Sequence, residues 1–549
     1  MAAPESDAAT WDDVIVGAGS AGCVVAARLA DAGRRVLLLE AGGSDDRHMV
    51  RMPLGAGKLL SDPNAVWSFE TEADPGAAGR RMIWPRGRML GGSSSVNGML
   101  WVRGDPERWN AWGDACPGWG WRDIGPAMRA IEDANFATDP ARGRGGPVTI
   151  QQIARGDRLS SAFIEACAAV GIPATADYNG AQHEGVGRLQ MCTRRGRRWS
   201  AADAYLKPAM RRCPNLSVET GALARRVVFE GLRATGVEYA ARDGSLRVAR
   251  ARRQIVIAAG AIQSPQLLEL SGIGAGERLK ALGIPVVADR REVGENLSDH
   301  YHIRVTWRSR GVLTVNQLMA RPWLHGPLAM LEWQLRGTGM LAEIAATAHA
   351  LARTAPDATR PDMKLQIHKI SAADRTGYTK GTGLDDYPGV SIGYFQLYPE
   401  SRGSVHVATA DPAAPPSIRP NYLSTRADRA AALRGLHLSR AIGGAAPLRP
   451  FLVEETRPGR ATQDDEALLD YIRRHGATSY HPVGTCRMGI DPDSVVDPAC
   501  RVRGVDGLRV VDASVMPFLV SSNTNAPAIA IGERATQLIL GEDNRAAVA

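Results

Sequence analysis

The chain has 549 residues, of which 44% are hydrophobic and 23% are charged, a composition typical of a folded globular protein with more than one domain. Lysine and arginine outnumber aspartate and glutamate by 66 to 58, but the basic residues are scattered and not interleaved with aromatic residues, which disfavours a nucleic-acid partner. Seven cysteines without a Cys-X-X-Cys pair disfavour a zinc site and a disulfide framework, and predict a reducing compartment.

The N-terminal segment, residues 1–13, is polar and acidic and contains no apolar stretch typical of a secretion signal. No run of about 18 apolar residues occurs that would predict a membrane-spanning helix. We therefore expect a cytoplasmic protein without stable membrane insertion, and the sequence leaves its oligomeric state open.

The first predicted elements are a strand, a glycine-rich turn, a helix and a second strand. The apolar run 13–16 enters G-A-G-S-A-G, a helical stretch follows, and the second strand, RRVLLLE, ends at Glu40. Gly17 permits a tight turn, Gly19 lets a pyrophosphate approach the backbone, and Gly22 allows close packing of helix and strand. Free amides near Ser20 and Ala21 favour phosphate binding at the helix start.

Glu40 follows Gly22 by 18 residues, where a carboxylate accepts hydrogen bonds from a ribose. With the adjacent Ala41 it completes a dinucleotide-binding pattern. The pattern alone does not separate FAD from NAD, whereas an acid at this position disfavours NADP.

Two further stretches are rich in glycine and small polar residues. Residues 87–101, GRMLGGSSSVNGMLW, suit a polar ring held against the main chain. A third buried strand, 254–260, leads into residues 260–274, GAIQSPQLLELSGIG, where Ser264 and Pro265 are expected to cap a helix that ends at Gly272. Upstream, PNLSVETGALARRVVFEG predicts two strands of a hairpin-like unit.

The second half of the chain has different patterns of apolar and polar residues. Residues 360–410 contain the two-residue alternation of half-exposed antiparallel strands, and residues 424–446 and 463–475 have helical spacing. Close to the C-terminus, HPVGTCRMG at 481–489 contains a histidine and a cysteine. His481 lacks a partner at metal-ligand spacing, so a metal site is disfavoured, and Cys486 is expected to be a buried thiol.

The stretches 87–101, 260–274, HPVGTCRMG and VVDASVMPFLVSSNTNAPAIAIGERA together resemble the signatures of the glucose–methanol–choline (GMC) oxidoreductases, and are most similar to the choline-dehydrogenase-like branch. The resemblance implies an α/β fold: a Rossmann-like FAD-binding domain with an inserted α+β substrate domain built on an antiparallel sheet. It assigns residues 1–150, 199–305 and 478–549 to the FAD-binding domain, and residues 151–198 and 306–477 to the substrate domain.

The resemblance also assigns the cofactor contacts. Some family members attach FAD covalently through a histidine where this chain has Val96, so we expect non-covalent FAD. Beyond the glycine turn, Glu40 and Ala41, the implied FAD-binding residues are Trp67, Arg88, Gly92, Ser93, Asn97, Gly98, Met99, Ala224, Gly260, Asp512, Ala513 and Pro527.

By the same resemblance, His481 is the active-site histidine. It takes the proton of the substrate hydroxyl, a task suited to imidazole. The matching position for a second group that holds the substrate oxygen is Asn525, in SSNTNAP. Choline-acting relatives carry a glutamate where this chain has an alanine two residues from Glu343, which disfavours choline and favours a primary aliphatic or aryl alcohol.

The function predicted is therefore FAD-dependent oxidation of an alcohol to an aldehyde, with hydride transfer to the flavin. The electron acceptor is a quinone or dye, or else O2. Ser479, where some oxidases carry valine, favours a dehydrogenase. Two alternatives stay open: an O2-using alcohol oxidase of the same family, and a flavin-containing hydroxynitrile lyase.

Overall fold

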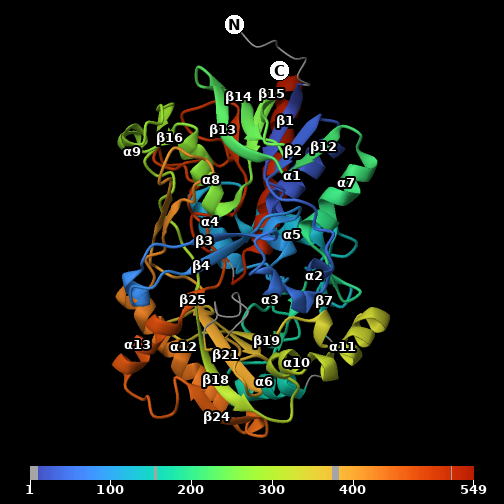
Figure 1. The fold of residues 1–549 in the computed structure, drawn as a ribbon, viewed down its shortest axis with the longest axis vertical. Helices are drawn as coiled ribbons and strands as arrows, with labels where there is room; N and C mark the ends of the chain where they lie inside the picture. The colour runs from blue at the N-terminus through green and yellow to red at the C-terminus, as the bar shows by residue number, and fades with distance from the viewer. Residues whose placement is uncertain (1–9, 154–157, 374–382, 521, 549) are drawn as a thin grey trace.

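The computed structural model describes residues 10–153, 158–373, 383–520 and 522–548. Residues 1–9 of the polar N-terminal segment and residues 374–382 of the strand-rich segment lie outside the described residues. Two large sheets lie towards opposite ends of the long axis (Figure 1).

The first sheet has the strand order β12-β2-β1-β15-β14-β13, with β26 pairing to β15. Strands β12, β2, β1, β15 and β26 pair in parallel, whereas β15, β14 and β13 are antiparallel. Long β15 belongs to both parts, since residues near Ile257 pair with β1 and residues near Leu246 pair with β14. The bounds are β1 Trp11–Val16, β2 Val36–Glu40, β12 Leu216–Thr220, β13 Leu223–Glu230, β14 Arg233–Ala240, β15 Leu246–Ile257 and β26 Leu508–Val510.

Helices α1 (Ser20–Asp31) and α14 (Asn525–Val548) pack against each other beside the first sheet. Val24, Val25 and Leu29 of α1 are completely buried. Each such side chain contributes about 1.5–3 kcal/mol to stability by its removal from water. The predicted strand, helix and strand at 13–40 are confirmed, apart from the earlier start of β1 at Trp11.

The second sheet is antiparallel, with the order β24-β18-β21-β20-β19-β8 and β25 paired to β18. Helices α12, α13 and α6 pack near it (Figure 1). The bounds are β8 Gly185–Arg188, β18 Tyr301–Ser309, β19 Ala346–Ala352, β20 Met363–His368, β21 Gly389–Gln396, β24 Leu452–Arg457, β25 Ala477–Thr478, α6 Arg158–Ala169, α12 Arg426–Gly444 and α13 Asp465–His475.

The remaining helices and strands connect or cover the two sheets. The helices are α2 His48–Arg51, α3 Ala56–Leu59, α4 Pro106–Ala115, α5 Trp121–Ile131, α7 Lys207–Arg212, α8 Gly260–Leu270, α9 Gly276–Ala281, α10 Val315–Ala320 and α11 Pro322–Arg336. The strands are β3 Val66–Glu70, β4 Ile83–Gly87, β5 Glu132–Asp133, β6 Val148–Thr149, β7 Gln151–Gln152, β9 Gln190–Met191, β10 Thr193–Arg194, β11 Arg197–Arg198, β16 Ile273–Gly274, β17 Ala288–Asp289, β22 Ser404–His406 and β23 Ser417–Arg419.

The expected helices at 424–446 and 463–475 and the strands within 360–410 are confirmed as α12, α13, β20, β21 and β22. The expectation that these strands are half-exposed is wrong for β20 and β21, because every residue of β20 and all but the last residue of β21 are buried. The hairpin predicted from PNLSVETGALARRVVFEG is wrong. Strand β12 pairs in parallel with β2, and β13 pairs with β14, so the two strands belong to different parts of one sheet. The predicted domain boundaries stay predictions; the boundary at residue 305 falls inside β18.

Within the described ranges, no helix combines the length and apolar character needed to cross a lipid bilayer.

Gly22 provides a direct test of how α1 packs on the turn that precedes it. A Cβ atom at Gly22 would lie 1.9 Å from the carbonyl oxygen of Gly17, a contact that only backbone movement can relieve. We expect Gly22→Ala to lower the free energy of unfolding by about 1–3 kcal/mol. Urea unfolding of the purified variants measures this change.

The matched control is Gly541→Ala in α14, where a Cβ would meet no atom within 4 Å. Alanine there should raise stability by about 0.5–1 kcal/mol, because it is a better helix former than glycine. Equal stability of the Gly22→Ala variant and the parent protein would contradict the close approach of helix and turn.

Candidate functional site

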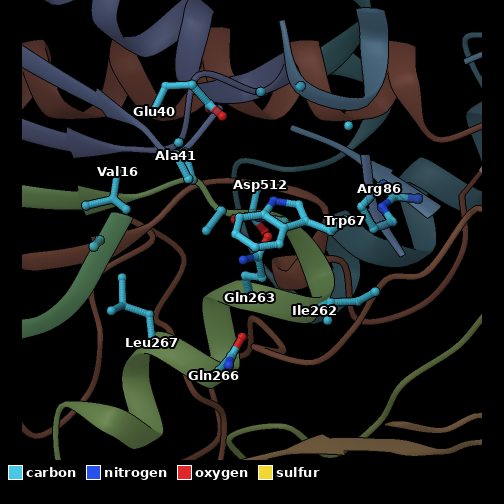
Figure 2. Close-up of a pocket in the computed structure, with 18 of the residues that line it drawn as sticks. Val16, Glu40, Ala41, Trp67, Arg86, Ile262, Gln263, Gln266, Leu267 and Asp512 are labelled. Atoms are coloured by element: carbon cyan, nitrogen blue, oxygen red, sulfur yellow. The ribbon is translucent and has the colours of Figure 1, made fainter. Parts of the chain in front are cut away.

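A cleft of about 1110 Å³, including space open to solvent, lies at the carboxyl ends of the parallel strands (Figure 2). Such ends are where doubly wound sheets bind their ligands. The residues that line the cleft are Val16, Gly17, Gly19, Ser20, Ala21, Leu39, Glu40, Ala41, Trp67, Arg86, Gly87, Gly92, Ser93, Ala222, Leu223, Ala224, Ala258, Ala259, Gly260, Ala261, Ile262, Gln263, Gln266, Leu267, Leu270, Pro412, Asp512, Ala513 and Ala528.

Two glycine-rich loops meet at the start of α1. Gly17 has a φ of +100°, and a Cβ there would lie 2.6 Å from the carbonyl oxygen of Ala258. In the other loop, a Cβ at Gly92 would lie 2.7 Å from the Cα of Gly19. Side chains at these positions would fill the space through which a phosphate reaches the amides at the helix N-terminus. The two motifs, more than 70 residues apart, therefore form one cradle.

Glu40 ends β2 and faces the cleft (Figure 2). Its two carboxylate oxygens accept hydrogen bonds from the amides of Ala18 (2.9 Å) and Gly42 (2.8 Å). Burial raises the pKa of Glu40 to about 7, and these amide hydrogen bonds oppose the rise. The side chain is thus fixed with oxygen lone pairs at the cleft, as a ribose hydroxyl requires.

Asp512 joins the start of α8 to the C-terminal segment. Its Oδ2 accepts hydrogen bonds from the amide of Gly260 (2.9 Å) and from the hydroxyl of Ser264 (2.5 Å). The predicted helix start at Pro265 is wrong: α8 begins at Gly260, and Pro265 lies inside it. Ser264 accepts from the amide of Ala259 at 3.1 Å, so it stabilises the turn that enters the helix.

Most of the predicted cofactor residues line the cleft: Gly17, Gly19, Ser20, Ala21, Glu40, Ala41, Trp67, Gly92, Ser93, Ala224, Gly260, Asp512 and Ala513.

The other predicted cofactor residues support that lining. Gly22 packs on Gly17, and the guanidinium of Arg88 lies 4.2 Å from the ring centre of Trp67. Asn97 Oδ1 accepts hydrogen bonds from the amide of Met99 (2.8 Å) and from Arg198 (3.0 Å). Gly98 lies near Ile344. Pro527 lies in the first turn of α14.

Sequence reasoning missed several lining residues. Gln263 and Gln266 project from α8 toward the cleft, and Arg86 lies beside Trp67 (Figure 2). The two glutamines fall inside the stretch 260–274 at a spacing of three, which places them on one helix face and could have identified them. Arg86 directly precedes the stretch 87–101 and carried no signal of its own.

The turn that carries His481 is built by pairing between distant segments. Strand β25 pairs with the start of β18, so Thr478 lies opposite Tyr301, and the amide of Ser479 donates to the carbonyl oxygen of His300 (2.8 Å). Tyr480, which lies between Ser479 and His481 in the sequence, has a φ of +65°, a left-handed conformation that is uncommon for a residue of this size. Its carbonyl oxygen accepts from Arg86 (2.9 Å), which connects the turn to the cleft.

Asp299 holds this turn in place. One carboxylate oxygen accepts from the backbone amide of His481 (2.8 Å), and the other accepts from the hydroxyls of Thr478 (2.6 Å) and Tyr422. Burial raises the pKa of Asp299, and these hydrogen bonds oppose the rise.

Two imidazole rings lie end to end at the site. His300 Nε2 is 2.9 Å from the carbonyl oxygen of Leu397, and His300 Nδ1 is 3.0 Å from His481 Nδ1. A carbonyl only accepts, so His300 carries its proton on Nε2 and its Nδ1 is an acceptor. Burial lowers the pKa of His300 to about 3, which keeps it neutral. His481 therefore carries its proton on Nδ1, and its Nε2 is the nitrogen that accepts a hydrogen bond or a proton.

The other side of His481 leads to the same assignment. Lys364 Nζ donates to Asn523 Oδ1 at 2.7 Å, which turns the amide nitrogen of Asn523 toward His481 Nε2, 3.0 Å away. An amide nitrogen is a donor, so His481 Nε2 is the acceptor. Lys364 is 1% exposed, and burial lowers its pKa to about 7.

The assignment of Asn525 as the partner of His481 is corrected by this arrangement. Asn525 begins α14, and its Oδ1 accepts from the hydroxyl of Ser20 at 2.8 Å, at the phosphate end of the cleft. Asn523, two residues earlier, is the amide beside His481. His300 and Lys364 were also missed, because they come from distant parts of the chain and carry no local motif.

Cys486 is completely buried, and burial raises the pKa of its thiol well above the ordinary value. Across the described ranges, no group of three or more histidine, cysteine, aspartate or glutamate side chains is placed to hold a metal ion.

The chain matches the models of one known protein family. Residues 11–302 match the N-terminal model of the GMC oxidoreductases, and residues 399–532 match the C-terminal model. The chain belongs to the GMC oxidoreductase family.

Relatives and solved structures agree with this family. The chain is 38% identical over 536 residues to an oxygen-dependent choline dehydrogenase of Rhizobium johnstonii, with 97% of this chain and 96% of the relative covered. It is 39% identical over 535 residues to another of that name from Brucella anthropi, with coverage of 96% and 95%. Pyridoxine 4-oxidase from Mesorbium loti superimposes with a TM-score of 0.86 at 34% identity, over 96% of this chain and 99% of that one.

The predicted fold is confirmed: an FAD-binding domain of Rossmann type with a substrate domain on an antiparallel sheet. The cofactor is FAD, and the protein is a flavin oxidoreductase that acts on alcohol-type substrates. The cleft fits this cofactor, because its glycine cradle admits a pyrophosphate and Glu40 presents acceptors to a ribose.

The two asparagines of SSNTNAP should differ in what they affect. Asn523→Ala removes a donor beside His481 Nε2, and we expect kcat/KM for an oxidised alcohol to fall by about tenfold to a hundredfold at normal flavin content. Asn525→Ala removes the contact with Ser20, and we expect less bound flavin but near-parent turnover per bound flavin. Flavin absorbance together with dye-coupled turnover separates the two effects. A loss of turnover per flavin confined to Asn525→Ala would contradict the correction.

Proposed function

We propose that this protein is a dehydrogenase that oxidises an uncharged primary alcohol, aliphatic or aryl, to the aldehyde. The observation that carries the proposal is the hydrogen-bond chain through His481. From Leu397 at one end and Lys364 at the other, it leaves His481 Nε2 as an acceptor.

In the proposed reaction the hydroxyl of the alcohol displaces Asn523 as the hydrogen-bond donor to His481 Nε2, and Nε2 then takes the hydroxyl proton. The amide nitrogen of Asn523 has a second hydrogen that can donate to the substrate oxygen, and this favours the alkoxide as the proton leaves. His300 keeps the His481 ring in place by accepting its Nδ1 proton. Bound FAD supplies the acceptor for the hydride from the substrate carbon.

We further propose that FAD is bound without a covalent link at position 96. Val96 is 3% exposed and packs in a small core with Val50, Leu59 and Val66. Its side chain has no nucleophilic atom, so it offers no attachment point.

The charges around His481 support a neutral substrate over choline, although the relatives described above are named for choline. Lys364 is a buried cation two hydrogen bonds from His481, and its charge contributes to lowering the pKa of both His300 and His349. Glu343, the acid nearest in sequence to the expected ammonium-binding position, lies 3.7 Å from Lys369, which offsets its charge. Below pH 7 a quaternary ammonium beside His481 would therefore be repelled by the charge of Lys364, and the carboxylate of Asp299 is already engaged by the hydrogen bonds described above.

The electron acceptor is proposed to be a quinone or dye. Ser479, where some oxidases carry valine, is buried and tied to His300 by its amide. An O2-using oxidase differs in one observable, the rate at which reduced flavin regains its colour in air.

Anaerobic mixing of the yellow protein with a panel of primary alcohols tests the proposal. We expect bleaching by uncharged aliphatic or aryl alcohols, slow recovery in air, and rapid recovery with a quinone or dye. His481→Ala should slow bleaching about 10²–10⁴-fold with flavin still bound. His437→Ala, at an exposed histidine bonded to Asp465, is the matched control. Bleaching by His481→Ala at the parent rate would contradict the role of this histidine, and rapid recovery in air would indicate an oxidase.

The charge of Lys364 predicts a pH-dependent substrate preference. Burial lowers the pKa of Lys364 to about 7, so this side chain is a cation below pH 7 and becomes neutral above it. We expect the ratio of kcat/KM for a neutral alcohol to that for choline to be highest below pH 7 and to fall as the pH rises past it. Ionisations that affect both substrates equally cancel in this ratio.

In Lys364→Met the ratio should be smaller and independent of pH across this range. Lys58→Met, at an exposed lysine of α3, should retain the pH dependence of the parent protein. Choline oxidation that exceeds oxidation of every neutral alcohol at pH 6 would overturn the assignment of an uncharged substrate.

A further inference from the structure

Exposed apolar side chains are concentrated on one helical segment. Of the 14 large hydrophobic side chains that are exposed among the described residues, seven lie between residues 313 and 335. Three of them are 73–75% exposed. The seven side chains are Leu313, Met319, Trp323, Leu324, Leu328, Leu331 and Leu335. Soluble surfaces rarely gather apolar groups in this way without a binding partner.

Helix α11 is apolar on two faces. Leu324, Leu328, Leu331 and Leu335 follow each other at intervals of four, three and four residues, which places them along one exposed stripe. On the opposite side Trp333 is buried in a small core with residues that include Met52, Leu318 and Leu341. The core holds α11 to the protein while the leucine stripe faces outward, and Figure 1 shows α11 at the outer edge of the molecule.

Positive charge surrounds this stripe. Arg321 and Arg336 are exposed at the two ends of α11. The β10–β11 hairpin lies against the same helix, because Gly196 accepts from the indole nitrogen of Trp333 at 2.7 Å and the guanidinium of Arg197 lies 5.0 Å from the Trp333 ring centre. The hairpin adds the exposed side chains Arg194, Arg195 and Arg197. Glu332 is the only acidic residue in the sequence from 310 to 340.

We propose that this surface, defined as the exposed residues of 313–336 with Arg194, Arg195 and Arg197, binds peripherally to an anionic lipid bilayer. An apolar face bordered by arginines matches the boundary between acyl chains and negatively charged headgroups. The helix lies along the membrane surface, in agreement with the finding that no described helix can cross a bilayer.

A second copy of the chain suits the surface less well. Two copies related by a two-fold axis would bring their leucine stripes together, but each would also bring five arginines against a single exposed glutamate. Like charges across such an interface repel, whereas anionic headgroups neutralise them.

The chain that follows α11 leads to a glycine-rich loop of the flavin site. After Gly337 and the short helix Met340–Ala342, Ile344 approaches Gly98, so that a Cβ on Gly98 would lie 3.5 Å from Ile344 Cδ1. Gly98 belongs to the glycine-rich loop that borders the FAD cleft. A membrane bound at α11 would therefore hold the flavin domain close to acceptors dissolved in lipid.

Flotation of the FAD-loaded protein with vesicles tests the proposal. We expect binding to vesicles of phosphatidylcholine mixed with phosphatidylglycerol, and weaker binding to phosphatidylcholine alone or at high salt. The triple variant Trp323→Ser, Leu328→Ser, Leu335→Ser should reduce the bound fraction about tenfold. Arg195→Gln with Arg321→Gln should lose the preference for anionic vesicles.

The matched control, Leu232→Ser with Leu246→Ser, alters exposed leucines of the first sheet and should bind like the parent protein. Turnover with a water-soluble dye checks that every variant is folded. Absence of binding to anionic vesicles by the parent protein, or equal loss in the control, overturns the proposal. Light scattering that shows an oligomer which the triple variant dissociates, without vesicle binding, identifies the surface as a self-interface and also overturns it.

Discussion

The buried carboxylate of Asp299 is the constraint on which the geometry near His481 depends. It lies just before β18 and accepts hydrogen bonds from the backbone of His481 and from the hydroxyls of Thr478 and Tyr422. A buried carboxylate is tolerated when its oxygens accept hydrogen bonds in this way. Removing these donors would leave the carboxylate without partners and would lower the stability of the folded protein. Asp299 fixes the segment that follows β25 to the residues just before β18, where the chain enters the second sheet. This attachment also maintains the uncommon backbone conformation of Tyr480.

The orientation of His481 follows from groups that cannot reverse their roles. A carbonyl oxygen, at Leu397, only accepts, and Lys364 Nζ donates to the amide oxygen of Asn523, which also can only accept. Between these fixed ends, each intermediate group has one consistent arrangement: protonated Nε2 on His300, protonated Nδ1 on His481, and the amide nitrogen of Asn523 facing His481. The opposite tautomer of His481 would break the hydrogen bonds on both sides of the ring. The protein therefore pre-organises the acceptor atom without a carboxylate bonded to the imidazole, and this suits a base whose proton must later be released.

The sequence predicted well those features whose cause is local. The glycine spacing, apolar runs and acid at Glu40 predicted β1, α1 and β2, because the turn glycines and apolar spacing that indicate these elements all lie within one short segment. The hairpin at 214–231 failed for the opposite reason. Strand β12 has an adjacent candidate partner in β13, but it pairs with β2, more than 170 residues earlier, and local patterns cannot rank such partners.

In the active site, too, residues with a local sequence signal were predicted and residues that depend on distant contacts were not. His481 stands in a distinctive motif and was predicted, whereas His300 and Lys364 act only through contacts with distant residues. The two asparagines of SSNTNAP are two residues apart at the start of a helix, where the chain changes direction. An error of two positions there exchanges a residue beside the base for one beside Ser20, at the phosphate end of the cleft. Proline at 265 misled in a similar way, since proline is common in the first turn of a helix but here lies within α8.

The cleft and the region around His481 present different side-chain groups, and this difference fits the chemistry expected of each. Toward the cofactor, Glu40 offers oxygen acceptors, which suit the hydroxyl donors of a ribose, and backbone amides face the phosphates. Beside His481 the side chains that face the substrate oxygen are donors or support a donor, since Lys364 holds the amide nitrogen of Asn523 toward the site. Oxidation of an alcohol concentrates negative charge on the substrate oxygen before the carbon loses its hydride. Donors held in a buried site stabilise that charge more strongly than water can, because they need not reorient when it forms. The lysine is kept in the buried interior, where burial lowers its pKa, and a negative oxygen beside it would favour its charged form.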